Sequence, residues 1–467
     1  MIHIQNVSFS YDDGESNLEK IQLAAAPGEC ILLCGASGCG KTTITKLVNG
    51  LIPHFEEGHL EGRAVVAHMV VGDTPLYQLS QKVGSVFQNP KSQFFNIDSD
   101  SELAFGLENC GTAPDLIRSR VDTVTKELEI QHLLHRNVFS MSGGEKQSLA
   151  FASVYAMNPQ VYVLDEPSAN LDTAATQHLR NQIKAIKAQG KTILIAEHRL
   201  YYLADLIDRA VYIESGRIRN IYTREAFLAL SENERHSLGL RTIQPPEQKV
   251  IAPPPVSGAL EIRDLTVKYK KETVISHLSF SASKGKVLGI VGHNGAGKST
   301  LMRCIAGLIK PASGQILFEG KPLKEKARNK LCYMIMQDVN HQLFGDSVWN
   351  ECTLSRGEEG HEEEITQALK AYDLLEFRDK HPMSLSGGQK QRLAIATGVA
   401  AGKEVLLFDE PTSGLDYSHM KAVSKTLRDL SHAGHVVIVI THDQELINDT
   451  CDQILDLNHL PRKECSL

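Results

Sequence analysis

Two short tracts of the sequence have the composition of phosphate-binding loops. Both match G-x-x-x-x-G-K-[ST], and each lies between an apolar run of strand length and a segment with helical spacing. Glycines allow successive backbone N–H groups to point at phosphate oxygens at a helix N-terminus. The lysine would contact the β- and γ-phosphates, and the Ser or Thr hydroxyl would bind Mg²⁺. The predicted nucleotide contacts are Gly35, Ala36, Ser37, Gly38, Cys39, Gly40, Lys41, Thr42 and Thr43, and then Gly292, His293, Asn294, Gly295, Ala296, Gly297, Lys298, Ser299 and Thr300.

A pair of carboxylates follows each of two later apolar runs. Asp165 and Asp409 end the runs VYVLD and VLLFD, and Glu166 and Glu410 come directly after them. Ligands of α/β sheets bind at the C-terminal ends of strands. We therefore expect the aspartates to hold Mg²⁺ through water. We expect the glutamates to orient and polarise the attacking water as general bases.

Two histidines share the spacing of these carboxylates. His198 follows Asp165 at the same distance along the sequence as His442 follows Asp409, and each histidine comes after an apolar strand. Phosphoryl transfer depends on positioning and on compensating the charge of the transferred group. The matched spacing predicts that both histidines contact the γ-phosphate.

The chemical motifs belong to a repeat of domain size. The aspartates and the histidines share one offset between the two copies, whereas the loop lysines Lys41 and Lys298 are slightly further apart. The difference in length therefore arises between the first motif and the later ones, where loops tolerate insertions. Between the copies, TIQPPEQKVIAPPPVSG holds five of the 17 prolines and predicts a linker, either an extended polyproline tether or an ordinary surface loop. The predicted divisions are residues 1–241, the linker 242–258 and residues 259–467.

Composition and patterning indicate two globular α/β domains. The chain has 467 residues, 42% hydrophobic and 22% charged, which is an ordinary globular balance. Continuous Val/Ile/Leu runs suit a parallel sheet covered on both faces, and residues 174–188 have helical spacing. We expect a mixed sheet core with helices in each half.

Charge, cysteines and hydropathy exclude several classes of protein. The net charge of −7 gives no general attraction for nucleic acid. Nine scattered cysteines without a CxxC pair predict free thiols in a reducing cytosol. The start has no signal-peptide pattern, and no run of about 18 apolar residues occurs. We expect a chain that neither spans a membrane nor enters the secretory route.

With these motifs, nearly the whole chain resembles the ATPases of ABC (ATP-binding cassette) transporters. The decisive motif is LSGGQ, present at 141–145 as MSGGE and at 385–389 as LSGGQ. In that family it opens a helix whose N-terminus caps ATP held by the opposite domain, so the two halves form an intramolecular pseudo-dimer. The resemblance implies one site with Lys41, Gln88, Asp165, Glu166, His198, Ser386 and Gly388, and a second with Lys298, Gln337, Asp409, Glu410, His442, Ser142 and Gly144.

Further family motifs follow from the same resemblance. Gln88 and Gln337 resemble the Q-loop glutamines, which reach Mg²⁺ and face a membrane partner. The stretches from 168 and from 413 resemble D-loops. Tyr11 and Tyr269 precede their lysines by nearly equal distances along the sequence, and they either stack on adenine or serve in packing.

The stretch QNPKSQFFNIDSDSELAFGLEN is similar to that of energy-coupling-factor (ECF) and cobalt-type importer ATPases, and the second copy keeps only QLF of it. In those importers the segment docks a transmembrane scaffold (T-type) subunit, which holds a small substrate-binding membrane subunit. The resemblance implies a role at the cytoplasmic face of the membrane in importing a vitamin, a vitamin precursor or a metal ion.

Two departures from the family pattern bear on activity. Arg392 is replaced by Ser148 in the first copy, and Glu145 stands where Gln is commoner. A carboxylate near phosphate motivates the hypothesis that the two sites hydrolyse ATP unequally. A ribosome-binding twin-ABC protein and an exporter ATPase remain alternatives. The short proline-rich linker disfavours the former, whose halves are joined by a long charged helix.

Overall fold

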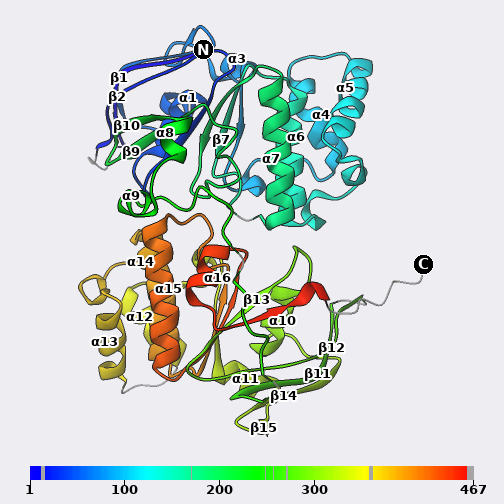
Figure 1. Ribbon diagram of the computed structural model, residues 1–467, viewed down its shortest axis with the longest axis vertical. Helices are drawn as coiled ribbons and strands as arrows, with labels where there is room; N and C mark the ends of the chain where they lie inside the picture. The colour runs from blue at the N-terminus through cyan, green and yellow to red at the C-terminus, as the bar shows by residue number, and fades with distance from the viewer. Residues whose placement is uncertain are drawn as a thin grey trace. The chain divides into compact units, whose positions relative to one another are not determined.

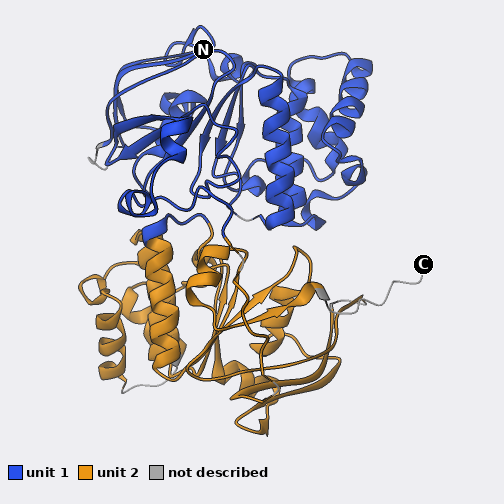
Figure 2. Ribbon diagram, viewed as in Figure 1, with its two compact units in different colours: residues 1–246, 414–418 blue, residues 247–413, 419–467 orange. Residues whose placement is uncertain are grey.

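A computed structural model describes residues 1–11, 16–169, 171–247, 249–255, 257–269, 272–356 and 361–459. The chain divides into two compact units, shown in Figure 1 along the chain and in Figure 2 by colour. Unit 1 is Met1–Pro246 with Gly414–Ser418, and unit 2 is Glu247–Ser413 with His419–Leu467. The division after residue 246 falls within the proline-rich segment 242–258.

Unit 1 contains two sheets. An antiparallel sheet has the order β2-β1-β4-β5, and a larger sheet has the order β10-β9-β3-β8-β7-β6. The larger sheet is parallel except for β10, which pairs antiparallel with β9. The strands are β1 Ile2–Ser10, β2 Ser16–Ala25, β3 Cys30–Cys34, β4 His59–Val66, β5 Met69–Val70, β6 Val83–Val86, β7 Val161–Asp165, β8 Thr192–Ala196, β9 Arg209–Glu214 and β10 Arg217–Thr223.

Helices cover the larger sheet of unit 1 and form a separate group beside it (Figure 1). In the separate group α4, α5 and α6 pack on one another. The expected helix at 174–188 is confirmed as α7. The helices are α1 Lys41–Val48, α2 Leu51–His54, α3 Leu76–Leu79, α4 Ser99–Asn109, α5 Pro114–Glu127, α6 Gly143–Ala156, α7 Thr173–Ala188, α8 Arg224–Leu228 and α9 Glu232–Ser237, with short 3-10 turns η1 Pro90–Ser92, η2 Gln131–Leu133 and η3 Val138–Ser140.

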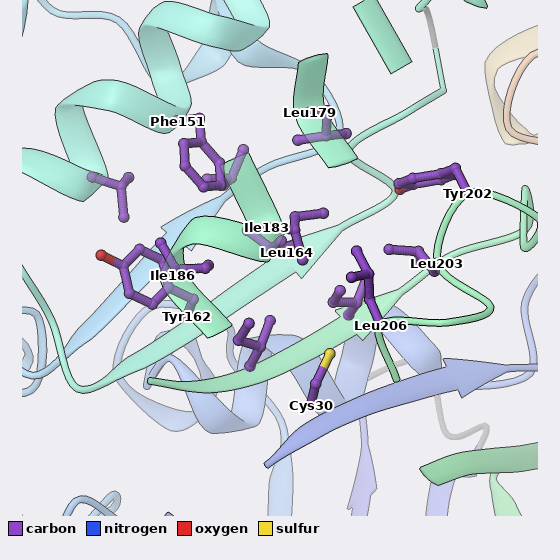
Figure 3. Close-up of a cluster of buried hydrophobic side chains, with 14 of the residues drawn as sticks. Cys30, Phe151, Tyr162, Leu164, Leu179, Ile183, Ile186, Tyr202, Leu203 and Leu206 are labelled. Atoms are coloured by element: carbon purple, nitrogen blue, oxygen red, sulfur yellow. The ribbon is translucent and has the colours of Figure 1, made fainter. Parts of the chain in front are cut away.

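One core of unit 1 lies between the larger sheet and α7. Leu179 and Ile183 recur at helical spacing on α7 and pack toward Tyr162 and Leu164 of β7, as Figure 3 shows. Strands β3, β7 and β8 are fully buried because both faces of the sheet are covered. The apolar runs in the sequence therefore mark the central strands correctly.

Unit 2 repeats this plan with fewer strands. Its antiparallel sheet has the order β12-β11-β14-β15, and its parallel sheet has the order β16-β17-β18-β13-β19. The strands are β11 Leu260–Tyr269, β12 Glu272–Ala282, β13 Val287–Val291, β14 Ser313–Phe318, β15 Lys321–Pro322, β16 Cys332–Ile335, β17 Val405–Asp409, β18 Val436–Ile440 and β19 Gln453–Asp456. The α/β architecture expected for each half is confirmed.

The helices of unit 2 follow the same order as those of unit 1. Helices α12, α13 and α14 enclose a separate apolar cluster that includes Leu369, Leu374 and Leu393. The helices are α10 Lys298–Ile305, α11 Glu325–Leu331, α12 Val348–Arg356, α13 Glu362–Ala371, α14 Gly387–Ala400, α15 Tyr417–His432 and α16 Gln444–Thr450, with 3-10 turns η4 Val339–His341, η5 Leu375–Phe377, η6 Pro382–Ser384 and η7 Leu457–His459.

Described residues of the proline-rich segment lie along an edge of unit 2. Ala252 forms a parallel bridge with Gln453, and the N–H of Ile454 donates to the carbonyl of Ala252 at 3.0 Å. The Asn448 amide donates to the Glu247 carbonyl at 2.6 Å. Ala252 therefore covers the outer edge of β19, much as β10 covers β9 in unit 1.

No helix within the described ranges is long and apolar enough to cross a lipid bilayer. Each of the eight cysteines that the structure describes is a free thiol, and only Cys110 among them is exposed.

Candidate nucleotide sites

Parallel pairing places the predicted chemical residues of unit 1 at one sheet edge. Asp165, the last residue of β7, pairs with Ala196, the last residue of β8, and His198 follows shortly after. The phosphate-binding loop begins directly after β3. Strand β8 lies between β7 and β3 and pairs with both. Residues from distant parts of the sequence thus converge at the C-terminal ends of three strands.

The loop of unit 1 depends on glycine at two positions. Gly35 has φ +146°, and a Cβ atom there would lie 2.1 Å from the Ile213 carbonyl oxygen. Gly40 has φ +106° and precedes α1 directly. The buried Lys41 ammonium donates to the carbonyls of Gly35 and Ala36 at 3.0 and 2.9 Å. The ammonium is therefore held against the loop, where phosphate would bind.

Asp165 lies beside the hydroxyls at the start of α1. Thr42 Oγ1 donates to its Oδ1 at 3.2 Å, and Thr45 Oγ1 donates to its Oδ2 at 3.3 Å. Burial, and next the charge of Glu166, raise the pKa of Asp165 to about 6, against the hydroxyls and Lys41. A buried carboxylate next to a hydroxyl fits a divalent cation, which would restore the carboxylate's preference for the charged form.

Glu166 is held in a strained conformation with two neighbours. Its φ is +44°, in the left-handed region that costs a residue with a side chain about 1 kcal/mol. Gln88 Nε2 donates to its Oε2 at 2.6 Å, and His198 Nε2 lies 3.4 Å from its Oε1. Within the described part of the chain, the buried Nε2 of His198 has no hydrogen-bond partner. An incoming phosphate oxygen would supply that partner.

The loop of unit 2 repeats these contacts. The Lys298 ammonium donates to the carbonyls of Gly292 and His293 at 2.7 and 3.2 Å. Ser299 Oγ donates to Asp409 Oδ2 at 3.2 Å. Burial raises the pKa of Asp409, against the Ser299 hydrogen bond and the charges of Lys298 and Arg303. Both loops therefore offer a lysine, a hydroxyl and an aspartate with a raised pKa in one arrangement.

The second glutamate differs from the first in its partners. Glu410 has φ +48°, close to that of Glu166. Its Oε2 accepts from the His442 backbone N–H at 3.2 Å, and its Oε1 lies 3.6 Å from His442 Nε2. His442 Nε2 also lies 2.9 Å from Lys298 Nζ. In unit 2 the histidine thus contacts both the loop lysine and the glutamate.

Each LSGGQ-like motif begins a helix with a capping box. Ser142 caps α6, with Glu145 N–H donating to Ser142 Oγ at 3.3 Å and Ser142 N–H donating to Glu145 Oε2 at 2.7 Å. Arg136 Nη1 lies 2.5 Å from Glu145 Oε1. Although burial acts to raise it, the Ser142 N–H and Arg136 bring the pKa of Glu145 below its ordinary value. The unusual carboxylate is therefore compensated within its own unit.

The second motif makes the same box without a charge. Gln389 N–H donates to Ser386 Oγ at 3.4 Å, and Ser386 N–H donates to Gln389 Oε1 at 2.8 Å. Gly144 and Gly388 lie in the first turns of α6 and α14. Both helix N-termini therefore present small residues, which leave room for phosphate.

The remaining predicted residues are placed as follows. Gln88 and Gln337 each lie two residues after the edge strands β6 and β16. Tyr11 follows β1. Its ring lies edge-on to that of Phe9 with ring centroids 4.9 Å apart, and Lys46 Nζ lies 5.8 Å from the centroid of the Tyr11 ring. Tyr269 ends β11, and its side chain lies outside the described residues, as does Asn170 of the first D-loop-like stretch. The adenine contacts stay predictions.

Two pairs of buried carboxylates were missed by sequence reasoning. Glu197, next to His198, and Asp443, next to His442, are buried and fully engaged in hydrogen bonds. Glu102 and Glu351 are also buried, in α4 and α12. An acidic residue adjoining each histidine was a visible signal, but its position before one histidine and after the other concealed the correspondence.

Glu102 and Glu351 hold the loops after the two glutamines. Glu102 Oε2 accepts from the N–H groups of Phe95 and Asn96 at 3.1 and 2.9 Å. Glu351 Oε2 accepts from the N–H groups of Phe344 and Gly345, both at 2.7 Å. The two carboxylates therefore fix the backbone on which Phe95 and Phe344 stand.

Exposed apolar side chains lie near Phe95 and at the corresponding positions of unit 2. In unit 1, Phe95 is 75% exposed and stacks on Phe105 with ring centroids 5.0 Å apart. Its neighbour Ile97 accepts a backbone hydrogen bond from Val138 at 2.8 Å, which brings Phe139 alongside. We call Phe95, Ile97, Phe105 and Phe139 the unit 1 apolar surface. The corresponding residues of unit 2, here called the unit 2 apolar surface, are Phe344, Leu354 and Met383.

Comparisons with known proteins agree with this geometry. A family model described as ABC transporter matches residues 18–169 and 275–413. A Treponema denticola protein named "Putative ABC transporter ATP-binding protein" is 47% identical, over 98% of this chain and 95% of the relative. A Bacillus subtilis protein named "Putative HMP/thiamine import ATP-binding protein" is 31% identical, over 98% and 90%.

Among solved structures, a chain from the complex of an archaeal ribosomal stalk protein and an archaeal ribosome recycling factor has a TM-score of 0.63. It covers 97% of this chain and 87% of that chain at 21% identity, so the likeness shows the fold alone. The matched family regions include both phosphate-binding loops and both carboxylate pairs. The chain therefore belongs to the ABC transporter ATP-binding family, with two ABC regions that bind and hydrolyse ATP.

Proposed function

We propose that this protein powers an ECF-type ABC importer for a vitamin, a vitamin precursor or a metal ion. It acts at the cytoplasmic face of the cell membrane, bound to a T-type scaffold subunit and through it to a small substrate-binding subunit. The observation that carries the proposal is the pair of apolar surfaces, whose phenylalanines Phe95 and Phe344 lie at corresponding positions, seven residues after Gln88 and Gln337.

These surfaces have the properties of a prepared docking site. Exposed aromatic side chains that gather on a globular domain mark contact sites for other proteins. The buried carboxylates Glu102 and Glu351 hold the loops in place before any partner arrives. A preformed loop loses less conformational entropy on binding. Two such surfaces suit a scaffold that presents two apolar helices, one to each unit.

In this proposal Mg²⁺ accompanies ATP in both sites, where it would neutralise phosphate charge. Thr42 and Ser299 offer hydroxyls, Asp165 and Asp409 offer carboxylates through water, and Gln88 and Gln337 offer amide oxygens. The described residues contain no cluster of three His, Cys, Asp or Glu suited to a metal. A cation held largely by phosphate, one hydroxyl and water needs no such cluster.

The catalytic residues act by positioning and charge. Glu166 and Glu410 polarise the attacking water, while His198 and His442 contact the γ-phosphate. Each site is completed by the other half's signature motif, with Ser386 and Gly388 for the first site and Ser142 and Gly144 for the second. Closure of the two halves on ATP then supplies the mechanical step.

Affinity purification of the full-length protein from detergent-solubilised membranes tests this function. We expect small integral membrane proteins to co-purify, and Phe95→Ser with Phe344→Ser to reduce their recovery at least fivefold. Leu116→Ser, at an exposed apolar position on α5 outside both surfaces, is the matched control. Recovery of ribosomes without membrane proteins would instead support the translation-factor class, to which the archaeal recycling factor belongs.

A further inference from the structure

Each predicted γ-phosphate histidine adjoins a buried carboxylate, on opposite sides in the two units. Glu197 precedes His198 and is 2% exposed, whereas Asp443 follows His442 and is 8% exposed. When the two histidines are aligned, the positions that match these carboxylates hold Thr441 and Arg199. A buried carboxylate is costly unless hydrogen-bond donors compensate it. Each unit nevertheless has one buried carboxylate beside its histidine, although at different positions. This indicates that the two carboxylates have the same role.

In unit 1 Glu197 connects two segments of the site. Its Oε2 accepts from Ser168 Oγ at 2.7 Å, from Ser168 N–H at 3.3 Å and from Tyr202 OH at 2.8 Å. Its Oε1 accepts from the N–H groups of His198 and Arg199 at 2.7 and 3.1 Å. Tyr202 itself is a buried member of the core between the larger sheet and α7 (Figure 3). The carboxylate thus ties the backbone that carries the histidine to the segment following β7.

In unit 2 Asp443 links the corresponding two segments from the other side of the histidine, while the His442 N–H itself donates to Glu410 Oε2. Its Oδ2 accepts from Thr412 Oγ1 at 2.7 Å, and Thr412 occupies the position of Ser168. Its Oδ1 accepts from the N–H groups of Glu445 and Leu446 at 3.1 and 3.3 Å, which caps α16. The segment after the catalytic glutamate is therefore fastened to the histidine segment in both units, by carboxylates two positions apart.

We propose that Glu197 is a positioning residue for His198 in ATP hydrolysis, and that Asp443 is its counterpart for His442. Each carboxylate is bonded to a neighbouring hydroxyl and to backbone N–H groups of its own unit. Each acts by fixing the backbone on both sides of the γ-phosphate, and the inference rests on the proposed role of the histidines. We call the hydrogen bonds of each carboxylate the brace of its histidine. Misplacing a catalytic group by about 1 Å lowers turnover as much as ~100-fold. Loss of the brace should therefore lower kcat more than it weakens nucleotide binding.

The two arrangements in one chain provide the test. In the full-length protein, Glu197→Thr installs the residue of unit 2 and removes the brace of unit 1. Glu197→Thr with Arg199→Asp transplants the whole arrangement of unit 2. Arg199→Asp alone controls for the loss of its bonds to Leu171 and Thr176. His198→Ala sets the scale of losing the histidine. The readouts are kcat, KM for ATP and the unfolding midpoint.

We expect Glu197→Thr to lower kcat at least tenfold, approaching the loss in His198→Ala, with KM for ATP changed less than threefold. The double variant should recover at least half of the wild-type kcat. If Glu197→Thr unfolds, the double variant decides: recovery of both folding and kcat supports the brace.

Wild-type kcat in Glu197→Thr, beside a low kcat in His198→Ala, would overturn the inference. So would a double variant that folds without regaining kcat, or one that does not fold. An undiminished kcat in His198→Ala would overturn the role of the histidine itself, which separates failure of the proposed site from failure of the brace.

Discussion

The side-chain amide of Gln88 donates a 2.6 Å hydrogen bond to Oε2 of Glu166, the candidate general base. Gln88 lies shortly after β6 and shortly before Phe95 of the unit 1 apolar surface. The group proposed to orient water is therefore bonded directly to the segment proposed to meet the membrane scaffold. A partner that moves this segment would also move the base.

Gln88→Ala removes this hydrogen bond and leaves Glu166 with His198 as its side-chain neighbour. We expect kcat for ATP to fall about threefold to tenfold, because the base keeps its position but loses a strong orienting contact. Steady-state hydrolysis by the purified protein measures it. Gln337→Ala is the matched variant of unit 2. A rate that rises in Gln88→Ala would show that the bond restrains the base.

The two candidate bases have different surroundings, which sharpens the hypothesis of unequal sites. Glu166→Gln and Glu410→Gln should each lower turnover, and the magnitude for a general base is roughly 100-fold to 10,000-fold when its site dominates. We expect the loss in Glu166→Gln to exceed that in Glu410→Gln at least threefold in the assembled transporter. Equal losses would reject the asymmetry.

The raised pKa of Asp165 predicts that its charged carboxylate, which would serve cation binding, lowers the stability of the protein without nucleotide. The unfolded carboxyl loses its proton near pH ~3.9, whereas the folded one keeps it to about pH 6. Between these values the folded state binds more protons, so the free energy of unfolding falls as pH rises and then levels off. At pH 7 and without nucleotide, Asp165→Asn should stabilise unit 1 by up to about 3 kcal/mol, from a difference of about two in pKa at ~1.36 kcal/mol each.

Thermal unfolding of Asp165→Asn and of the wild type across pH 4 to 8 measures this effect. The extra stability of the variant should be fully present above pH 6 and vanish below pH 4, while Mg²⁺-dependent hydrolysis is lost. Asp409→Asn should change stability in the same direction, because burial raises the pKa of that carboxyl too. A variant less stable than the wild type at pH 7 would show that the carboxylate is already compensated without a cation.

The ion pair between Arg136 and Glu145 should protect ATP affinity. Without Arg136, the carboxylate at the start of α6 would repel phosphate, so Arg136→Ala should raise KM for ATP severalfold at low salt and less at high salt. Adding Glu145→Gln should restore KM, because Gln389 makes the same capping box without charge. If the double variant keeps the raised KM, charge is not the cause.

Much of the site could be predicted because its residues follow strands at fixed short distances. The aspartates end buried apolar runs, the glutamates and histidines come shortly after such runs, and the loop lysines follow them by one short loop. Parallel pairing then brings these strand ends together. Helical spacing and apolar strand runs likewise predicted α7 and the α/β core. Local spacing is sufficient wherever a side chain is placed by the end of its own strand.

The missed features depend on contacts between distant segments. Glu197 meets Ser168 from another strand end, and the unit 2 arrangement uses another position for its carboxylate, so no repeat register reveals it. The separate antiparallel sheets require β1 to pair with β4, although β2, β3 and two helices come between them in the sequence. The bridge from Ala252 to Gln453 joins the first part of unit 2 to its last strand. Proline content predicted a linker but not its pairing partner.

The most direct measurement is a structure of the full-length Glu166→Gln, Glu410→Gln protein trapped with ATP and Mg²⁺. We expect two nucleotides, one on Lys41 with Ser386 within about 3 Å of its phosphates, the other on Lys298 with Ser142 equally close. ATP bound wholly by the residues of one unit, with the signature serine of the other unit far from its phosphates, would show that the halves do not complete each other's sites.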